Sequence, residues 1–204
     1  MEHVTKESFN GIWNYFLSIE SDLENTSRYI EPSGQENVHS FEFAKIIILA
    51  STEVESVMKA ICFELTNEEK GNIGEYKQVI LARFPKITTA SVTISRLGKS
   101  ISPFEGWDVG PLNWWDAYGL VKHKRGTEFD KANYSNAVIS LSALYILIFY
   151  LAKICNIEFE DTKSRYIDSN YTRQFIAFAA PEQLPDFPAI DDGFETIEFQ
   201  SVKK

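Results

Sequence analysis

The chain has 204 residues and a formal net charge of -9 at neutral pH, with 44% hydrophobic and 14% aromatic residues. This length suits one domain with a large core and is short for two independent enzymes. The excess of acidic residues excludes broad, non-specific binding to DNA or RNA, because that affinity comes mainly from Lys and Arg side chains that neutralise phosphates. Any contact with nucleic acid must therefore be local.

Cysteine and histidine are sparse and scattered. Cys62 and Cys155 each lie in an apolar helical pattern without a nearby partner, and the histidines are His3, His39 and His123. Two free thiols are typical of a reducing compartment, and the polar N-terminus lacks an apolar signal segment, so a cytoplasmic protein is predicted. The sequence holds no glycine-rich phosphate loop, dinucleotide fingerprint or HExxH motif, and we expect neither a cofactor nor a metal.

Two long amphipathic helices are predicted in the first third of the chain. Apolar residues recur every three or four positions over about residues 7–29 and again over about residues 40–65. Pro32 and Gly34 in the linker end the first helix before the second begins. His39 is expected to cap the second helix or to lie on its surface. The short linker predicts an antiparallel helical hairpin.

The middle of the chain has a different pattern. Residues 76–84 predict a short third helix that Pro85 ends. Residues 87–102 are rich in β-branched side chains around a turn-like SRLG sequence, which predicts a small β-hairpin insert. The prolines and glycines of residues 103–111 predict a loop.

Two further helices are predicted, over residues 113–126 and from about residue 131 to residue 154. The uncharged stretch 132–152 is long enough to span a bilayer. Because its first half holds several Asn and Ser residues, we interpret it as a buried or dimer-forming helix, and no membrane association is expected. Residues 1–157 are predicted to form one helical domain and residues 158–204 an acidic, irregular appendage, in which FETIEFQ alternates like an edge strand.

The segment NWWDAYGLVKHKRGTEF, from Asn113 to Phe129, concentrates aromatic and basic residues on one predicted helix. Helical spacing gives two neighbouring stripes, Trp115, Tyr118, Lys122 and Arg125 on one and Asp116, Gly119 and His123 on the other. Both stripes could border one cleft, and Gly119 hints at close approach by a ligand or another backbone. In a catalytic interpretation, His123 exchanges a proton while Arg125 or Lys122 stabilises charge on a phosphate. In a structural interpretation, the aromatic residues are core and the cations complement the helix dipole.

Glu53 is the second unusual residue, because it shares a helix face with apolar residues of the second helix. Its carboxylate is therefore predicted to point toward the core. A buried carboxylate needs a cation, and Lys122, His123 or Arg125 are the natural partners. The outcome is either a structural ion pair, which we favour, or an acid–base pair.

This order of elements, together with WWDAYGLVKHKRGTEFDKANYSNAVISLSALYILI, resembles the HEPN-like superfamily of small helical bundles over residues 9–154. The likeness is greatest to an uncharacterised bacterial group in which a Lys-His-x-Arg element precedes an Ala-Asn start to the last core helix. The matching residues are Lys122, His123, Arg125, Ala132 and Asn133, and RYIEPS at residues 28–33 is also similar. The resemblance implies an up-and-down bundle that dimerises. Many members are ribonucleases or accessory proteins of toxin–antitoxin and antiphage systems.

The chain also departs from the superfamily pattern. Catalytic members carry an Arg, an adjacent polar residue and then a His a few positions later on one helix. The nearest Arg before His123 is Arg96, and Arg125 comes after His123 instead of before it. Of the catalytic residues of the superfamily, only the His has a counterpart in this chain, which is His123 as a residue that could exchange a proton. Gly119 stands where the related group tends to carry Asn.

The preferred hypothesis is a cytoplasmic, homodimeric HEPN-like accessory or regulatory module of a bacterial defence or toxin–antitoxin system, which binds RNA or a partner protein. The alternative is a metal-independent endoribonuclease. In that alternative His123 is the acid or base, assisted by Glu53, while Arg125 and Lys122 hold phosphate. Lys124 and Tyr118 would add further contacts to RNA.

Overall fold

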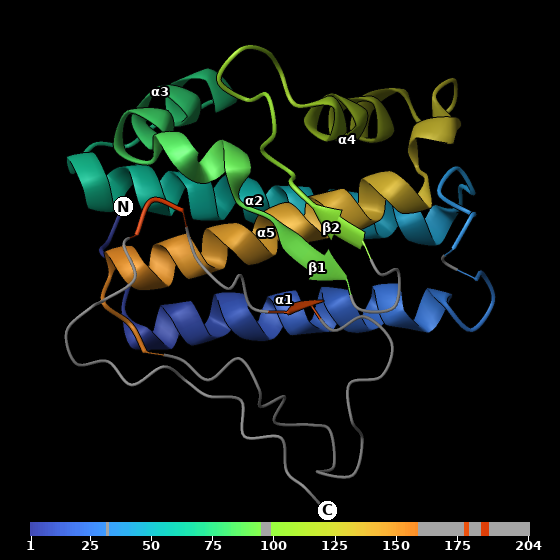
Figure 1. Ribbon diagram of the computed structural model, residues 1–204, viewed down its shortest axis with the longest axis horizontal. Coiled ribbons are helices and arrows are strands. Elements are labelled where there is room, and N and C mark those ends of the chain that lie inside the picture. Colours follow the sequence, from blue (N-terminus) through green and yellow to red (C-terminus); the bar gives the residue numbers. More distant parts are fainter. Residues whose placement is uncertain (32, 95–98, 159–177, 180–184, 188–204) are drawn as a thin grey trace, which may run out of the picture.

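The protein is mainly helical, as the sequence predicts. The computed structural model describes residues 1–31, 33–94, 99–158, 178–179 and 185–187 (Figure 1). All of the expected α-helices form within these residues. In chain order the elements are α1 (Lys6–Thr26), α2 (Phe41–Thr66), α3 (Ile73–Arg83), the 3-10 helix η1 (Pro85–Thr89), β1 (Val92–Ile94), β2 (Lys99–Ile101), α4 (Asn113–Lys124), the 3-10 helix η2 (Phe129–Lys131), α5 (Tyr134–Ile154) and β3 (Phe178–Ala179).

Helices α1, α2 and α5 lie side by side along the length of the molecule, and α3 and α4 pack against α2 (Figure 1). Helices α1 and α2 run in opposite directions, which confirms the predicted antiparallel hairpin. Helices α2 and α5 both begin at one end of the bundle, where α1 and α4 end. This end, which we call the loop end, therefore brings together segments that are far apart in the sequence.

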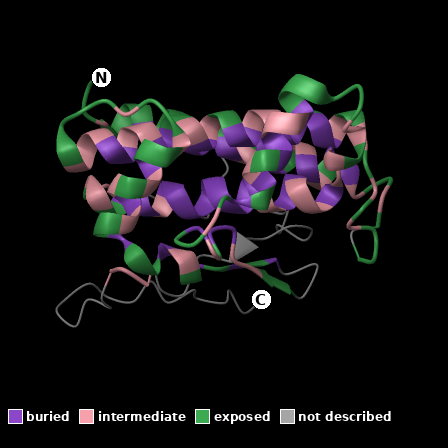
Figure 2. Cartoon of the chain, turned by 90° about the horizontal axis from the view of Figure 1, so that it is seen from above, coloured by how far each residue is buried: buried purple, intermediate pink, exposed green. Residues whose placement is uncertain are grey.

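Helix α5 is the centre of the hydrophobic core. It is apolar on all sides, and 15 of its 21 residues are buried, which is typical of a helix enclosed by other elements. By length and composition alone α5 could span a membrane, with a mean hydropathy of 2.1, yet 78% of that stretch is buried within the fold. Figure 2 shows the buried residues along the inner faces of the long helices and exposed residues on their outer faces.

The starts of α2 and α5 are held together by the backbone of residues 36–40 and 132–135, which we call the junction. Its hydrogen bonds are Ser40 N–H to Ala132 O at 3.1 Å, Tyr134 N–H to Val38 O at 2.9 Å and Ser135 N–H to Glu36 O at 3.0 Å. Each helix is also capped there, because Ser40 Oγ accepts from Phe43 N–H at 3.0 Å and Asn133 Oδ1 accepts from Asn136 N–H at 2.9 Å. The junction fixes both helix starts relative to each other.

The two strands of the predicted hairpin insert form, but over a shorter range than residues 87–102, and the expected SRLG turn at residues 95–98 lies outside the described residues. Strand β1 pairs antiparallel with β2, with Thr93 opposite Ser100. Residues 87–89 belong instead to η1, which begins at Pro85, a residue whose fixed φ suits a first helical position. Strand β3 pairs with the other edge of β1, so the sheet has the order β2-β1-β3.

Part of the predicted C-terminal appendage packs onto the helical body. The Asp186 carboxylate accepts hydrogen bonds from the Tyr150 hydroxyl at 2.9 Å and from the Lys86 backbone N–H at 2.8 Å. The Phe187 ring lies 5.2 Å from the Phe84 ring and 5.4 Å from the Tyr150 ring. Most of the predicted appendage, including the expected FETIEFQ strand, lies outside the described residues.

Loss of the α5 cap should weaken the fold measurably. Asn133→Ala removes the side chain that accepts from Asn136 N–H and donates to Asp130 O at 2.9 Å, and is expected to cost about 1 kcal/mol of unfolding free energy. Urea unfolding measures the loss. Asn14→Ala, at an exposed position within α1, is the matched control and should leave stability nearly unchanged. Equal midpoints for wild type and Asn133→Ala would contradict the capping role.

Candidate functional site

Helix α4 carries the predicted site, and its aromatic residues belong mainly to the core. Trp114, Ala117, Tyr118 and Val121 are buried, at the three- and four-residue spacing of one helix face. The Trp114 indole N–H donates to the Pro103 carbonyl at 2.7 Å, which satisfies its polar atom inside the fold. The structural interpretation is therefore confirmed for Trp114 and Tyr118, whereas Trp115 is half-buried and packs against the core.

Tyr118 is not positioned to contact RNA, contrary to the prediction. Its side chain is only 5% exposed, and its hydroxyl lies 3.4 Å from Thr52 Oγ1 on α2. Lys122 Nζ donates to this hydroxyl at 3.1 Å and lies 5.2 Å from the centre of the Tyr118 ring. These contacts hold the stem of Lys122 along its own helix, while the residue stays exposed.

Glu53 does not form the predicted ion pair. Among the residues that the structure describes, no Lys, Arg or His side chain pairs with its carboxylate, which is half-buried on α2. Burial raises the pKa of Glu53, and no charged side chain in the described part of the chain offsets this effect. The hydrogen bond with Tyr118 raises the pKa of Lys122, and the charge of Glu55 adds to it.

The end of α4 exposes a group of basic residues, Lys122, His123, Lys124 and Arg125, which we call the basic end. Just beyond the helix, the Lys124 carbonyl closes a turn by accepting from the backbone N–H groups of Thr127 at 2.9 Å and Glu128 at 3.0 Å. Within the described part of the chain, no carboxylate forms an ion pair with any of these side chains. The basic end is therefore open to an anionic ligand.

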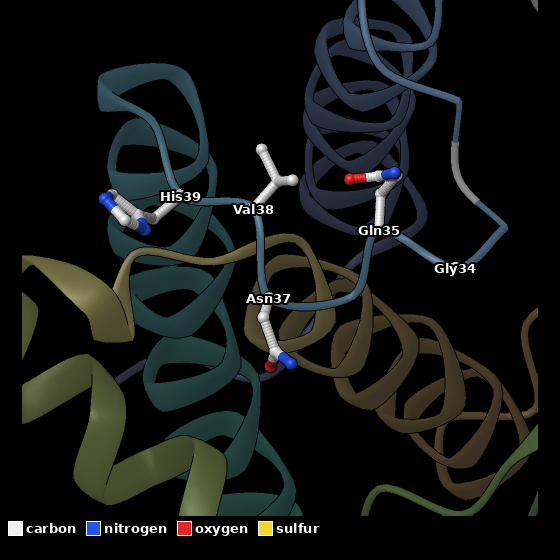
Figure 3. Close-up of a pocket in the computed structure, with 5 residues that line it drawn as sticks. All are labelled: Gly34, Gln35, Asn37, Val38 and His39. Atoms are coloured by element: carbon white, nitrogen blue, oxygen red, sulfur yellow. The ribbon is translucent and has the colours of Figure 1, made fainter.

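The two stripes of α4 border neither of two hollows on the surface of the described residues. A hollow of about 420 Å³ is lined by Gly34, Gln35, Asn37, Val38 and His39 (Figure 3), and another of about 480 Å³ lies between the end of α2 and α3. No residue of α4 lines either hollow. Gly119 marks no close approach, because a Cβ added there would meet no atom within 4 Å.

The structure also reveals surface residues that the sequence analysis missed. Phe41 is 74% exposed, its ring lies 4.8 Å from the half-buried Phe129 ring, and His39 packs edge-on against Phe129 at 5.2 Å. We call these three residues the ring cluster. His39 is indeed a surface residue, as one of its two predicted roles required, but the cap of α2 is Ser40. The sequence did contain a signal that Phe41 is exposed. Phe41 lies two residues before Phe43 and is therefore out of phase with the buried apolar residues of α2.

Among the described residues, no group of three or more His, Cys, Asp or Glu side chains could hold a metal ion. Comparisons with protein families, with curated proteins and with solved structures found no match. The HEPN-like resemblance therefore stays a prediction drawn from the sequence.

The Glu53 carboxylate, which has no cationic partner among the described residues, gives a pH-dependent prediction. Because burial raises the pKa of Glu53 in the folded protein, its ionised form opposes folding at pH values above that pKa. Glu53→Gln should stabilise the protein at neutral pH by at most about 1 kcal/mol. The gain should shrink as pH falls through the folded pKa and disappear below the ordinary value of 4.5. Urea unfolding of both proteins from about pH 4 to pH 8 measures this dependence.

Glu55→Gln is the matched control, because Glu55 lies on the same helix but near Lys122. It should give no comparable gain at neutral pH. A stabilisation by Glu55→Gln equal to that of Glu53→Gln, or a loss of stability in Glu53→Gln, would show that the account of Glu53 is wrong.

Proposed function

We propose that the protein is a non-catalytic accessory or regulatory module of HEPN-like type, which docks an anionic partner on the basic end of α4. We place it in the cytoplasm, as part of a bacterial defence or toxin–antitoxin system, and as a homodimer. The mainly helical fold is compatible with this proposal, and the five residues matched to the related bacterial group support it.

One observation carries the proposal. The basic end is exposed, is not paired with a carboxylate among the described residues, and adjoins neither of the hollows. Acid–base cleavage of a phosphodiester needs a proton-transfer group and a charge-stabilising group within hydrogen-bond reach of one bound substrate. An exposed helix end without a surrounding cleft can attract phosphate or carboxylate groups, but it does little to orient a reacting bond.

A metal-independent endoribonuclease remains the second candidate, favoured by one specific observation. His123 and Arg125 both project from the end of α4 and are exposed, so neither is committed to a structural contact among the described residues. A second copy of the chain could complete a cleft around them. Glu53 would take no part, because it does not pair with the basic end.

Cleavage assays distinguish the two candidates. Wild type, His123→Ala and Arg125→Ala should all leave a labelled single-stranded RNA intact in the presence of EDTA, and none should arrest growth when expressed in bacteria. The physical reason is that an exposed imidazole without a positioned partner lacks the geometry for proton transfer.

Cleavage by wild type that falls at least about 100-fold in His123→Ala would contradict the proposal and establish the ribonuclease. His3→Ala is the matched control in that event. His3 is also exposed but lies at the opposite end of the bundle, where its Nδ1 pairs with Glu64 at 3.0 Å.

A further inference from the structure

Residues 185–187 lie against the helical body at the end of the bundle opposite the loop end (Figure 1). The Phe187 ring packs on the rings of Phe84, just after α3, and Tyr150, near the end of α5, at 5.2 Å and 5.4 Å. The Phe84 and Tyr150 rings are themselves 5.1 Å apart. We call these two rings, together with the backbone N–H of Lys86, the tail site. Segments far apart in the sequence therefore form one site around a single aromatic side chain.

The Asp186 carboxylate uses both of its oxygens in the tail site. Oδ1 accepts from the Lys86 backbone N–H at 2.8 Å, and Oδ2 accepts from the Tyr150 hydroxyl at 2.9 Å. Burial raises the pKa of Tyr150, and the adjacent carboxylate adds to this effect, so the hydroxyl stays a donor. Among the described residues, this hydroxyl makes no other hydrogen bond, although the Tyr150 side chain is fully buried. The acid of the tail is thus the group that satisfies it.

This geometry selects an Asp that is followed directly by an aromatic residue. The two donors both need an acceptor oxygen, and an Asn side chain would present N–H groups to one of them. The Phe187 ring meets the Tyr150 ring at 66°, which is one of the edge-on arrangements that aromatic pairs prefer. An aliphatic side chain in its place would lose that ring–ring contact. Two adjacent residues therefore carry both the polar and the apolar part of the recognition.

Local sequence and local charge both favour the docked form. Pro185 and Asp186 lie in a turn, and both residue types are favoured in turns, so the segment needs little ordering when it docks. Arg83 and Lys86 lie within two residues of Phe84, and both are exposed. Their charges attract an acidic segment to this part of the surface. The tail site is therefore suited to a short peptide that is both acidic and aromatic.

The docked segment is small enough to be exchanged. Residues 185–187 are each half-buried, and two hydrogen bonds and one ring contact must offset the entropy lost by ordering them. Contacts of this size can open without unfolding of the core. Strand β3 ends at Ala179, six positions before Pro185, and its pairing with β1 keeps the segment nearby. Such a tether gives the segment an effective concentration in roughly the millimolar range.

We propose that the tail site is a docking site for short peptide segments in which Asp is followed by Phe, and that residues 185–187 occupy it as an internal ligand. A partner protein that carries such a segment binds by displacing them. The chemistry of this partner is given by the occupant that the structure shows, which combines a carboxylate for two donors with a ring for two rings. The inference does not depend on the basic end, which lies at the other end of the bundle.

A peptide added to the full chain tests the proposal. The probe is a labelled peptide of residues 182–190, EQLPDFPAI, followed by fluorescence anisotropy. It should bind the double variant Asp186→Ala with Phe187→Ala at least about tenfold more tightly than wild type, whose internal segment competes from its high effective concentration. The same peptide with both residues changed to Ala should bind neither protein. The control variant, Asp108→Ala with Phe41→Ala at exposed positions, should bind as weakly as wild type.

Two further measurements place the peptide in the tail site. Tyr150→Phe, added to the double variant, removes one donor and keeps the ring, so it should weaken peptide binding about tenfold without changing the circular dichroism spectrum. In wild type, excess peptide should move the backbone NMR signals of Asp186 and Phe187 to the positions they have in the free peptide. This second measurement needs no variant and decides the matter if the double variant does not fold.

Three results would overturn this inference. Failure of the peptide to bind a folded double variant, or unchanged signals of Asp186 and Phe187 in wild type, would mean that residues 185–187 only complete the core. Equal binding to wild type and double variant would place the peptide elsewhere on the surface. A wild type that is dimeric in sedimentation, beside a monomeric double variant, would assign the segment to the tail site of a second copy of this chain.

Discussion

Burial of α5 between α1 and α2 is the constraint from which the other contacts follow. An apolar helix with 15 buried residues of 21 has no polar face to present to solvent, so the other elements must enclose it. That enclosure brings the start of α5 beside the start of α2, where the junction satisfies backbone groups of both segments. The loop end is therefore built by the core and not by local sequence.

The same packing separates the two roles that the segment from residue 113 to residue 129 combines. The buried face of α4 contributes Trp114 and Tyr118 to the core, and these rings attach the helix to the fold. Its end then projects the cations into solvent, beside rings that come from the start of α2 and from η2. A core helix and a surface site thus share one short sequence, with Lys122 touching both through the Tyr118 hydroxyl.

The helices were predicted well from the sequence, because apolar residues that recur every three or four positions mark the buried face of a helix. The hairpin was also predicted, but η1 was not, since the pattern of β-branched residues at 87–89 is overridden by the turn that begins at Pro85. Glu53 illustrates a smaller error of the same origin. It is half-buried on α2, and among the described residues no cationic side chain pairs with it. The ring cluster could not be predicted from periodicity, because its members come from separate segments that only the junction brings together.

Mapping of the bound surface by NMR tests the central claim most directly, namely that the basic end is the docking surface on a frame that does not rearrange. Backbone amide shifts would be followed while inorganic polyphosphate is added to the labelled protein. The account predicts changes in residues 122–131, with the amides of α5 beyond its first turn unaffected. Changes centred on the hollow between α2 and α3, or spread through α5, would contradict it.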